Sequence, residues 1–105
     1  MSEHAVLAYL PLSNGAFGTA DERDSIHELS DRLEAWIKDA GVGEFDGDEF
    51  GGGECTLFMY GPDPDALFAA VAPILSDSPH AKGGYVIKRY GAADDTHTRE
   101  VRIEL

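Results

Sequence analysis

The feature that most constrains the fold is a glycine-rich turn between two strand patterns, in the run GVGEFDGDEFGGGECTLFMYG from Gly41 to Gly61. Strand-like sequence covers Glu44–Phe50 and Glu54–Tyr60, on either side of Gly51-Gly52-Gly53. Glycines supply positive φ angles without steric cost, so a hairpin turn is expected there. We therefore expect two adjacent antiparallel strands, which the rest of the chain extends into a sheet.

Two amphipathic helix patterns flank this hairpin. The segment Thr19-Ala20-Asp21-Glu22 has the spacing of a capping box and predicts a helix start, and Gly41 predicts the end of that helix. Asp63-Pro64 predicts the start of a second helix. Pro73 lies inside this second helix, so we expect the helix to kink or end near Ala72. The apolar stripes, at steps of three and four, are Ile26, Leu29, Leu33, Trp36, Ile37 and Ala40 in the first helix and Leu67, Phe68, Val71, Ile74 and Leu75 in the second.

Three further strand patterns complete the sheet. His4–Leu12 is apolar on both alternating sets, which is typical of a central strand, whereas Arg99–Leu105 alternates as a strand with one wet face does. Tyr85–Tyr90 is the remaining strand. The order βαββαβ plus a C-terminal strand, with right-handed crossovers, predicts a ferredoxin-like α+β sandwich. We expect one domain over residues 1–105, an antiparallel sheet of order 2-3-1-4-5 and both helices on one face.

Composition disfavours several classes of function. Twenty acids against eight Lys and Arg give a net charge of −12, which repels phosphate backbones and anionic membranes. We expect no nucleic-acid partner and no membrane partner, since no window approaches the ~18 apolar residues of a membrane span. The first residues lack the basic region of a signal peptide. Cys55 is the only cysteine, so an internal disulfide cannot form, and a cytoplasmic location with Cys55 as a small buried hydrophobe is expected.

The acids are concentrated in the middle of the chain. Between Lys38 and Lys82 there are nine Asp and Glu and no Lys or Arg. Five of them fall on the predicted hairpin, and we expect these five to form the binding surface for a basic protein partner: Glu44, Asp46, Asp48, Glu49 and Glu54. The alternative interpretation is that the charge serves solubility alone.

No catalytic residue, metal site or cofactor is predicted. The run Asp46-Gly47-Asp48-Glu49 offers carboxylates, but Leu57 occupies the twelfth position of a calcium loop, where a Glu is required. The glycine run precedes a strand and not a helix, which argues against a phosphate cradle. His97 with Asp94 and Asp95 could form a carboxylate-oriented general base, although a polar hairpin tip is the favoured interpretation. No nucleophile–base spacing is found, so a binding protein is favoured over an enzyme.

The face of the sheet away from the helices is expected to be apolar and aromatic. We assign Tyr9, Phe58, Tyr60 and Tyr90 to this face. Such a face is too apolar to leave in water, so a homodimer is expected, through this face or through the edge strand Arg99–Leu105. The alternative function is a small-molecule site or small enzyme at this face or in the dimer cleft, lined by the same aromatic residues.

Two resemblances follow from these motifs. The run FGTADERDSIHELSDRLEAWIKDAGVGEFDGDEFGGGECTLFMYGPDPDALF resembles a group of small uncharacterised bacterial proteins that share Gly-Glu-Phe-Asp-Gly, Gly-Gly-Gly-Glu and Tyr-Gly-Pro-Asp segments. That group implies no activity. The six residues Val42–Gly47, with Phe45 in place of a tyrosine, are similar to a Val-Glu-Tyr-Asp-Gly segment of bacterial ribonuclease E inhibitor proteins. Those are acidic, sheet-containing inhibitors, so the similarity implies an inhibitory role. Separately, the acidic hairpin predicts a basic protein partner such as a nuclease or toxin.

Overall fold

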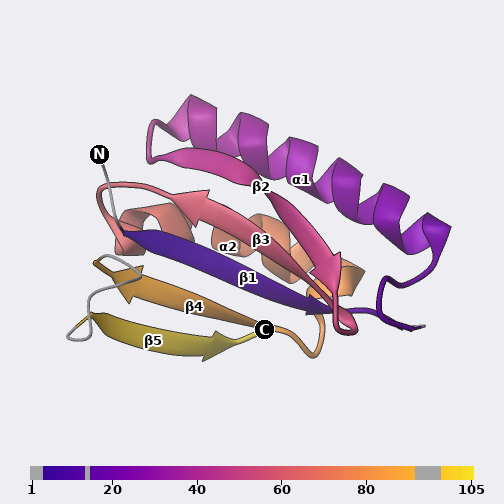
Figure 1. Cartoon of the computed structure of the whole chain (residues 1–105). Coiled ribbons are helices and arrows are strands. Elements are labelled where there is room, and N and C mark those ends of the chain that lie inside the picture. The colour runs from indigo at the N-terminus through magenta and orange to yellow at the C-terminus, as the bar shows by residue number, and fades with distance from the viewer. Residues whose placement is uncertain (1–3, 14, 92–97) are drawn as a thin grey trace.

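Five antiparallel strands form one sheet, and two helices lie on one of its faces (Figure 1). The computed structural model describes residues 4–13, 15–91 and 98–105. The strand order β2-β3-β1-β4-β5 confirms the predicted ferredoxin-like arrangement with an extra strand at one edge. The elements in chain order are β1 (Ala5–Pro11), α1 (Ala20–Ala40), β2 (Glu44–Gly51), β3 (Glu54–Tyr60), α2 (Pro64–Asp77), the short 3-10 helix η1 (Pro79–Ala81), β4 (Tyr85–Tyr90) and β5 (Arg99–Glu104). The predicted polar tip with Asp94, Asp95 and His97 lies outside the described residues.

The core lies between the sheet and the two helices. Its members come from the predicted stripes and alternations, including Val6, Leu10, Ile26, Leu33, Cys55, Leu57, Met59, Leu67 and Val71. Trp36 and Ala40 are corrections to the predicted stripe, because both are exposed, Trp36 by 52%. Successive side chains on a helix are rotated by about 100° around its axis. Ile37 therefore points at the sheet, while the preceding residue Trp36 is directed toward α2. Neither of the two helices, within the described parts of the chain, is both long and apolar enough to cross a membrane.

Local chemistry sets the helix ends where the sequence predicts them. The Thr19 hydroxyl accepts a hydrogen bond from the Glu22 N–H at 3.1 Å, and the Glu22 carboxylate accepts from the Thr19 N–H at 2.9 Å. This pair is a complete capping box. Gly41 ends α1 in the left-handed conformation, with φ at 67°. The Asp63 carboxylate caps α2 by accepting from two backbone N–H groups of the first turn.

Of the two outcomes expected at Pro73, a kink or an end of helix α2, the end does not occur. The helix does not end near Ala72 but continues through Pro73 to Asp77. Pro73 is exposed, whereas Ile74 and Leu75, the next two residues, are buried in the core. The burial of these two side chains holds the last turn in place, although the proline cannot donate its backbone hydrogen bond.

The hairpin of β2 and β3 contains a bulge near its open end. The turn is the expected glycine turn, with φ of 60° and 85° at Gly52 and Gly53. Pairing with β3 then shifts between Phe45 and Gly47, which leaves Asp46 as the extra residue of β2. A bulge bends its strand and redirects the side chains beyond it, so the faces of β2 cannot be assigned by simple alternation.

Candidate functional site

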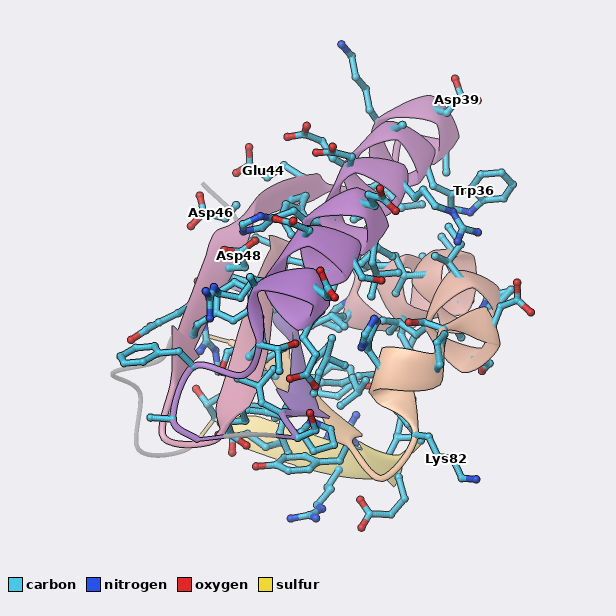
Figure 2. The ribbon with its side chains drawn as sticks, turned by 90° about the vertical axis from the view of Figure 1, so that its right-hand side faces the viewer. Trp36, Asp39, Glu44, Asp46, Asp48 and Lys82 are labelled. Carbon is cyan, nitrogen blue, oxygen red and sulfur yellow. The ribbon has the colours of Figure 1, made fainter. Side chains whose placement is uncertain are left out.

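A groove runs between helix α1 and strand β2. It consists of two adjoining hollows of about 230 and 590 Å³ that share Asp31, Glu34 and Phe45. We call it the acidic groove. It is lined by His27, Ser30, Asp31, Glu34, Ala35 and Lys38 of α1, and by Gly43, Glu44, Phe45, Asp46, Gly47 and Asp48 in and before β2. Figure 2 shows Glu44, Asp46 and Asp48 following one another along β2, beside α1.

The charge of the acidic groove is strongly negative. Five carboxylates line it, against the single lysine Lys38 in one hollow and His27 in the other. Asp31 and Glu34 are three residues apart on α1, a spacing that puts them on the same side of the helix. A concave surface lined by one sign of charge focuses the electrostatic potential, so this groove favours cations.

Asp48 connects the two walls of the groove. The Ser30 hydroxyl donates a hydrogen bond to Asp48 Oδ2 at 3.3 Å, and His27 Nε2 lies 3.8 Å from the same oxygen. The His27 ring also meets the Phe50 ring edge-on, with 5.5 Å between the centroids. Asp48 therefore links β2 to α1. The other acids of the groove are the ones we expect to contact a partner.

The five acids predicted as one binding surface are divided between two surfaces. Asp46 and Asp48 line the acidic groove, and Glu44, which pairs with Tyr60 at the start of β2, borders its larger hollow. Glu49 and Glu54, by their register with β3 and β1, lie on the open face of the sheet, which the helices do not cover. By the rise of a strand, Glu44 and Glu54 are about 20 Å apart, at opposite ends of the hairpin.

Two carboxylates of the groove were not predicted as site residues. Asp31 and Glu34 lie on the outer face of α1, which amphipathic periodicity assigns to solvent. They join the site because α1 packs beside β2. Sequence patterns do not encode the distance between these two elements. One signal was present, since Gly47 inside a strand pattern suggests a bulge and hence the redirection of Asp48.

Three of the four predicted aromatic residues lie on the open face of the sheet. Tyr9, Phe58 and Tyr60 share it, as the pairing of β1 with β3 requires. Tyr90 does not join them, because β4 pairs with β1 through Tyr85 opposite Tyr9. Side chains alternate between the two faces along a strand. Tyr90, five residues after Tyr85, is therefore on the helix-covered side.

The open face is partly covered by its own side chains. Tyr9 and Tyr85 stack with ring centroids 4.7 Å apart and an interplanar angle of 17°, and the Arg102 guanidinium lies 3.8 Å from the Tyr85 centroid. Burial and the neighbouring Tyr85 raise the pKa of the Tyr9 hydroxyl. Leu7, at the centre of this face, is only 8% exposed. The face is therefore less accessible than its composition implies.

Tyr90 belongs to a polar cluster that joins strand β4 to helix α2. The hydroxyl of Tyr90 donates a hydrogen bond to Asp65, and Lys88 Nζ lies 2.8 Å from the same carboxylate oxygen. Arg99 covers the Tyr90 ring at 4.2 Å from its centroid. The hydrogen bonds from Lys88 and Tyr90 lower the pKa of the Asp65 carboxyl.

A third hollow, of about 860 Å³, lies between α1 and α2. Its lining includes Trp36, Asp39, Pro73 and Asp77. In Figure 2, Trp36 and Asp39 are on the far side of α1 from the labelled acids of β2. This side of the molecule is thus separate from the acidic groove.

One contact between a possible nucleophile, Ser25, and a possible base, His80, is not predicted from the sequence. His80 Nε2 and Ser25 Oγ are hydrogen-bonded at 2.7 Å, which ties η1 to α1. An activated serine needs a base that a third group orients. The nearby Glu22 carboxylate is already used, because it accepts hydrogen bonds from the backbone N–H groups of Ser13 and Thr19. The contact is therefore interpreted as structural.

The Cys55 thiol is buried in the core. Burial raises the pKa of the Cys55 thiol to about 12, and the charge of Asp48 adds to this rise. Over residues 4–13, 15–91 and 98–105, no three His, Cys, Asp or Glu side chains come together as a metal ligand set.

Comparison of the chain with protein-family models, curated proteins and solved structures finds no match. The similarity to ribonuclease E inhibitor proteins stays a prediction from sequence.

Proposed function

We propose that this protein is a non-enzymatic binding or regulatory protein that holds a basic segment of another protein in the acidic groove. The observation that supports this is the convergence of Asp31 and Glu34 from α1 with Glu44 and Asp46 from β2 around one hollow surface beside Phe45. Lys and Arg heads would meet the carboxylates, and their apolar stems would contact Phe45. A basic nuclease or toxin has the chemistry that fits.

The energetics of the groove favour a cationic partner. Carboxylates on facing elements repel one another, and a basic segment relieves that repulsion. At about 0.15 M salt the screening length is about 8 Å, so the attraction acts mainly at contact. Association is expected to be steered electrostatically, with an on-rate that falls as salt rises.

Neutralising the groove tests this proposal. The groove variant carries Asp31→Asn, Glu34→Gln, Glu44→Gln and Asp46→Asn, all at exposed positions. A fluorescent oligo-arginine peptide serves as the probe, and anisotropy measures its affinity at low and physiological salt. We expect the affinity to fall about tenfold or more while the unfolding midpoint changes little, because exposed acids contribute little to stability.

The matched control changes the same charge elsewhere. It carries Asp24→Asn, Glu28→Gln, Asp39→Asn and Asp77→Asn, which are also exposed and line no part of the acidic groove. We expect a much smaller loss of affinity. Equal losses in the two variants would show that only net charge matters, and the acids would then serve solubility alone.

A second candidate function is a small-molecule site on the open face of the sheet. The stacked pair of Tyr9 and Tyr85 beside Arg102 favours it, since aromatic rings with a nearby cation suit planar, anionic ligands. The dye 1-anilinonaphthalene-8-sulfonate is such a ligand. We expect Tyr85→Leu to reduce the fluorescence of the bound dye and Tyr90→Leu, on the opposite face, to leave it unchanged. Equal dye binding by wild type and Tyr85→Leu would rule this site out.

We also propose that the protein is a homodimer and that it is cytoplasmic. The single Cys55 is fully buried, which suits a reducing compartment. Of the two dimer surfaces expected from sequence, the low exposure of Leu7 argues against the open face. The edge strand β5 is then the favoured contact.

A further inference from the structure

The two edges of the sheet differ in how they are protected. At one edge, β2 carries the bulge at Asp46 and has α1 beside it, both of which obstruct the addition of another strand (Figure 1). At the other edge, β5 pairs with β4 over six residues in unbroken register and contains no proline. Within the described residues no strand pairs with the outer side of β5.

The backbone direction of β5 can be deduced from one hydrogen bond. The Leu105 N–H donates to the Gly84 carbonyl at 3.0 Å, so Leu105 directs its backbone groups toward β4. Backbone direction alternates along a strand, so Glu100, Arg102 and Glu104 direct their N–H and C=O groups outward. This row is a template for an added antiparallel strand.

We propose that a second copy of this chain adds to β5, edge to edge, with Val101 opposite Val101 of the second copy. This inference rests on the homodimer proposed above and specifies its surface and register. A two-fold axis perpendicular to the sheet relates the two copies, so the helix side of one sheet continues into the helix side of the other. Odd-numbered residues of β5 therefore lie opposite odd-numbered residues, and even-numbered residues lie opposite even-numbered ones. In this register Glu100 lies opposite Arg102 of the second copy, and the pair occurs twice.

Charge selects this register over its neighbour. With Arg102 on the two-fold axis, two arginines would lie directly opposite each other, and like charges at that position are destabilising. With Val101 on the axis, Glu100 of each copy lies opposite Arg102 of the other, and the backbone groups of both residues point outward. The Arg102 guanidinium already donates to the Glu104 carboxylate of its own strand at 3.0 and 3.1 Å, so Glu100 of the second copy would add a second carboxylate beside it. The side-chain and backbone requirements are therefore met together.

The apolar side chains of β5 fit the same arrangement. Val101 and Ile103 lie on the helix side of the strand and are half-buried, although no part of α2 covers β5 extensively. In the proposed register Val101 packs on its own copy, and Ile103 lies opposite Arg99 of the second copy. Association would remove these apolar groups from water.

Charge reversal tests the register. Glu100→Arg alone and Arg102→Glu alone each create two like-charge pairs, and each is expected to weaken dimerisation about tenfold or more. A mixture of the two variants is expected to form a heterodimer, because both opposing pairs become attractive again. Native mass spectrometry identifies the heterodimer by its mass, and sedimentation velocity over a concentration series measures the affinities. Circular dichroism checks that each variant is folded.

Glu49→Arg is the matched control, since it makes the same change at an exposed position on the same face of the sheet, but on the opposite edge strand β2. We expect this variant to remain dimeric, because Glu49 lies four strands away from β5. A wild-type monomer at roughly tens of micromolar would overturn the homodimer itself. A dimer that tolerates both single reversals, or one that Glu49→Arg disrupts while Glu100→Arg does not, would overturn the register and leave the homodimer intact.

Discussion

The ionisation of Asp65 is linked to the folded structure through its hydrogen bonds. It lies in the first turn of α2 and accepts hydrogen bonds from Lys88 and Tyr90 of β4. These bonds favour the carboxylate over the carboxylic acid, which is why its pKa is lowered. The negative charge also complements the positive end of the helix dipole.

Replacing Asp65 with Asn should make stability less dependent on pH. A carboxyl whose pKa is lower in the folded state contributes stability above its unfolded pKa of about 4, and this contribution is lost as pH falls through the folded value. We expect Asp65→Asn to melt at a lower temperature than wild type at pH 7, with the difference shrinking below about pH 4. Melting curves at the two pH values measure it.

Asp39→Asn is the control for this prediction, because Asp39 is exposed at the end of α1. Its difference from wild type should be small at both pH values. If the Asp65→Asn difference stayed constant down to the lowest pH, the contacts of Asp65 would not act through its charge.

The sequence predicts a residue's position well where neighbours along the chain determine it. It predicts the position poorly where the pairing register between strands determines it. Thr19 and Gly41 were placed correctly, because a cap depends only on neighbours along the chain. Tyr90 was assigned to the wrong face, because the face depends on which residue of β4 lies opposite Tyr9. Trp36 was expected in the core, because periodicity cannot separate the centre of a stripe from its flank.

At the scale of elements, Pro73 is the residue that most weakens helix α2. It lies in the helix interior, where a proline loses one hydrogen bond and crowds the preceding carbonyl. Its side chain is exposed, so a smaller residue leaves no cavity. We expect Pro73→Ala to raise the free energy of unfolding by about 1–3 kcal/mol, measured by urea denaturation with an unchanged slope.

Pro79 provides the comparison, since it occupies the first position of η1, where a fixed φ is favourable. Pro79→Ala should leave stability unchanged or lower it slightly. A Pro73→Ala variant no more stable than wild type would mean that the helix has already adapted to its proline.

The elements and their order could be predicted because hydrophobic period, caps and crossover handedness agree with one another. The acidic groove could not, because it depends on how closely α1 lies beside β2 and on the bulge at Asp46. The sequence indicated that acids gather near the hairpin. It did not indicate that Asp31 and Glu34 of a helix complete the site.

At the scale of the whole molecule, the strand order places β2 and β5 at opposite edges of the sheet. The proposed binding in the acidic groove and the proposed self-association through β5 would therefore not compete for surface. In the proposed dimer the two grooves would lie at the far ends of a continuous sheet, about 40 Å apart by strand spacing. A partner with two basic segments separated by that span would gain avidity from bivalent attachment, whereas one with closer segments would not. The affinity of the dimer for a partner would thus depend on the spacing of the partner's basic segments as well as on their charge.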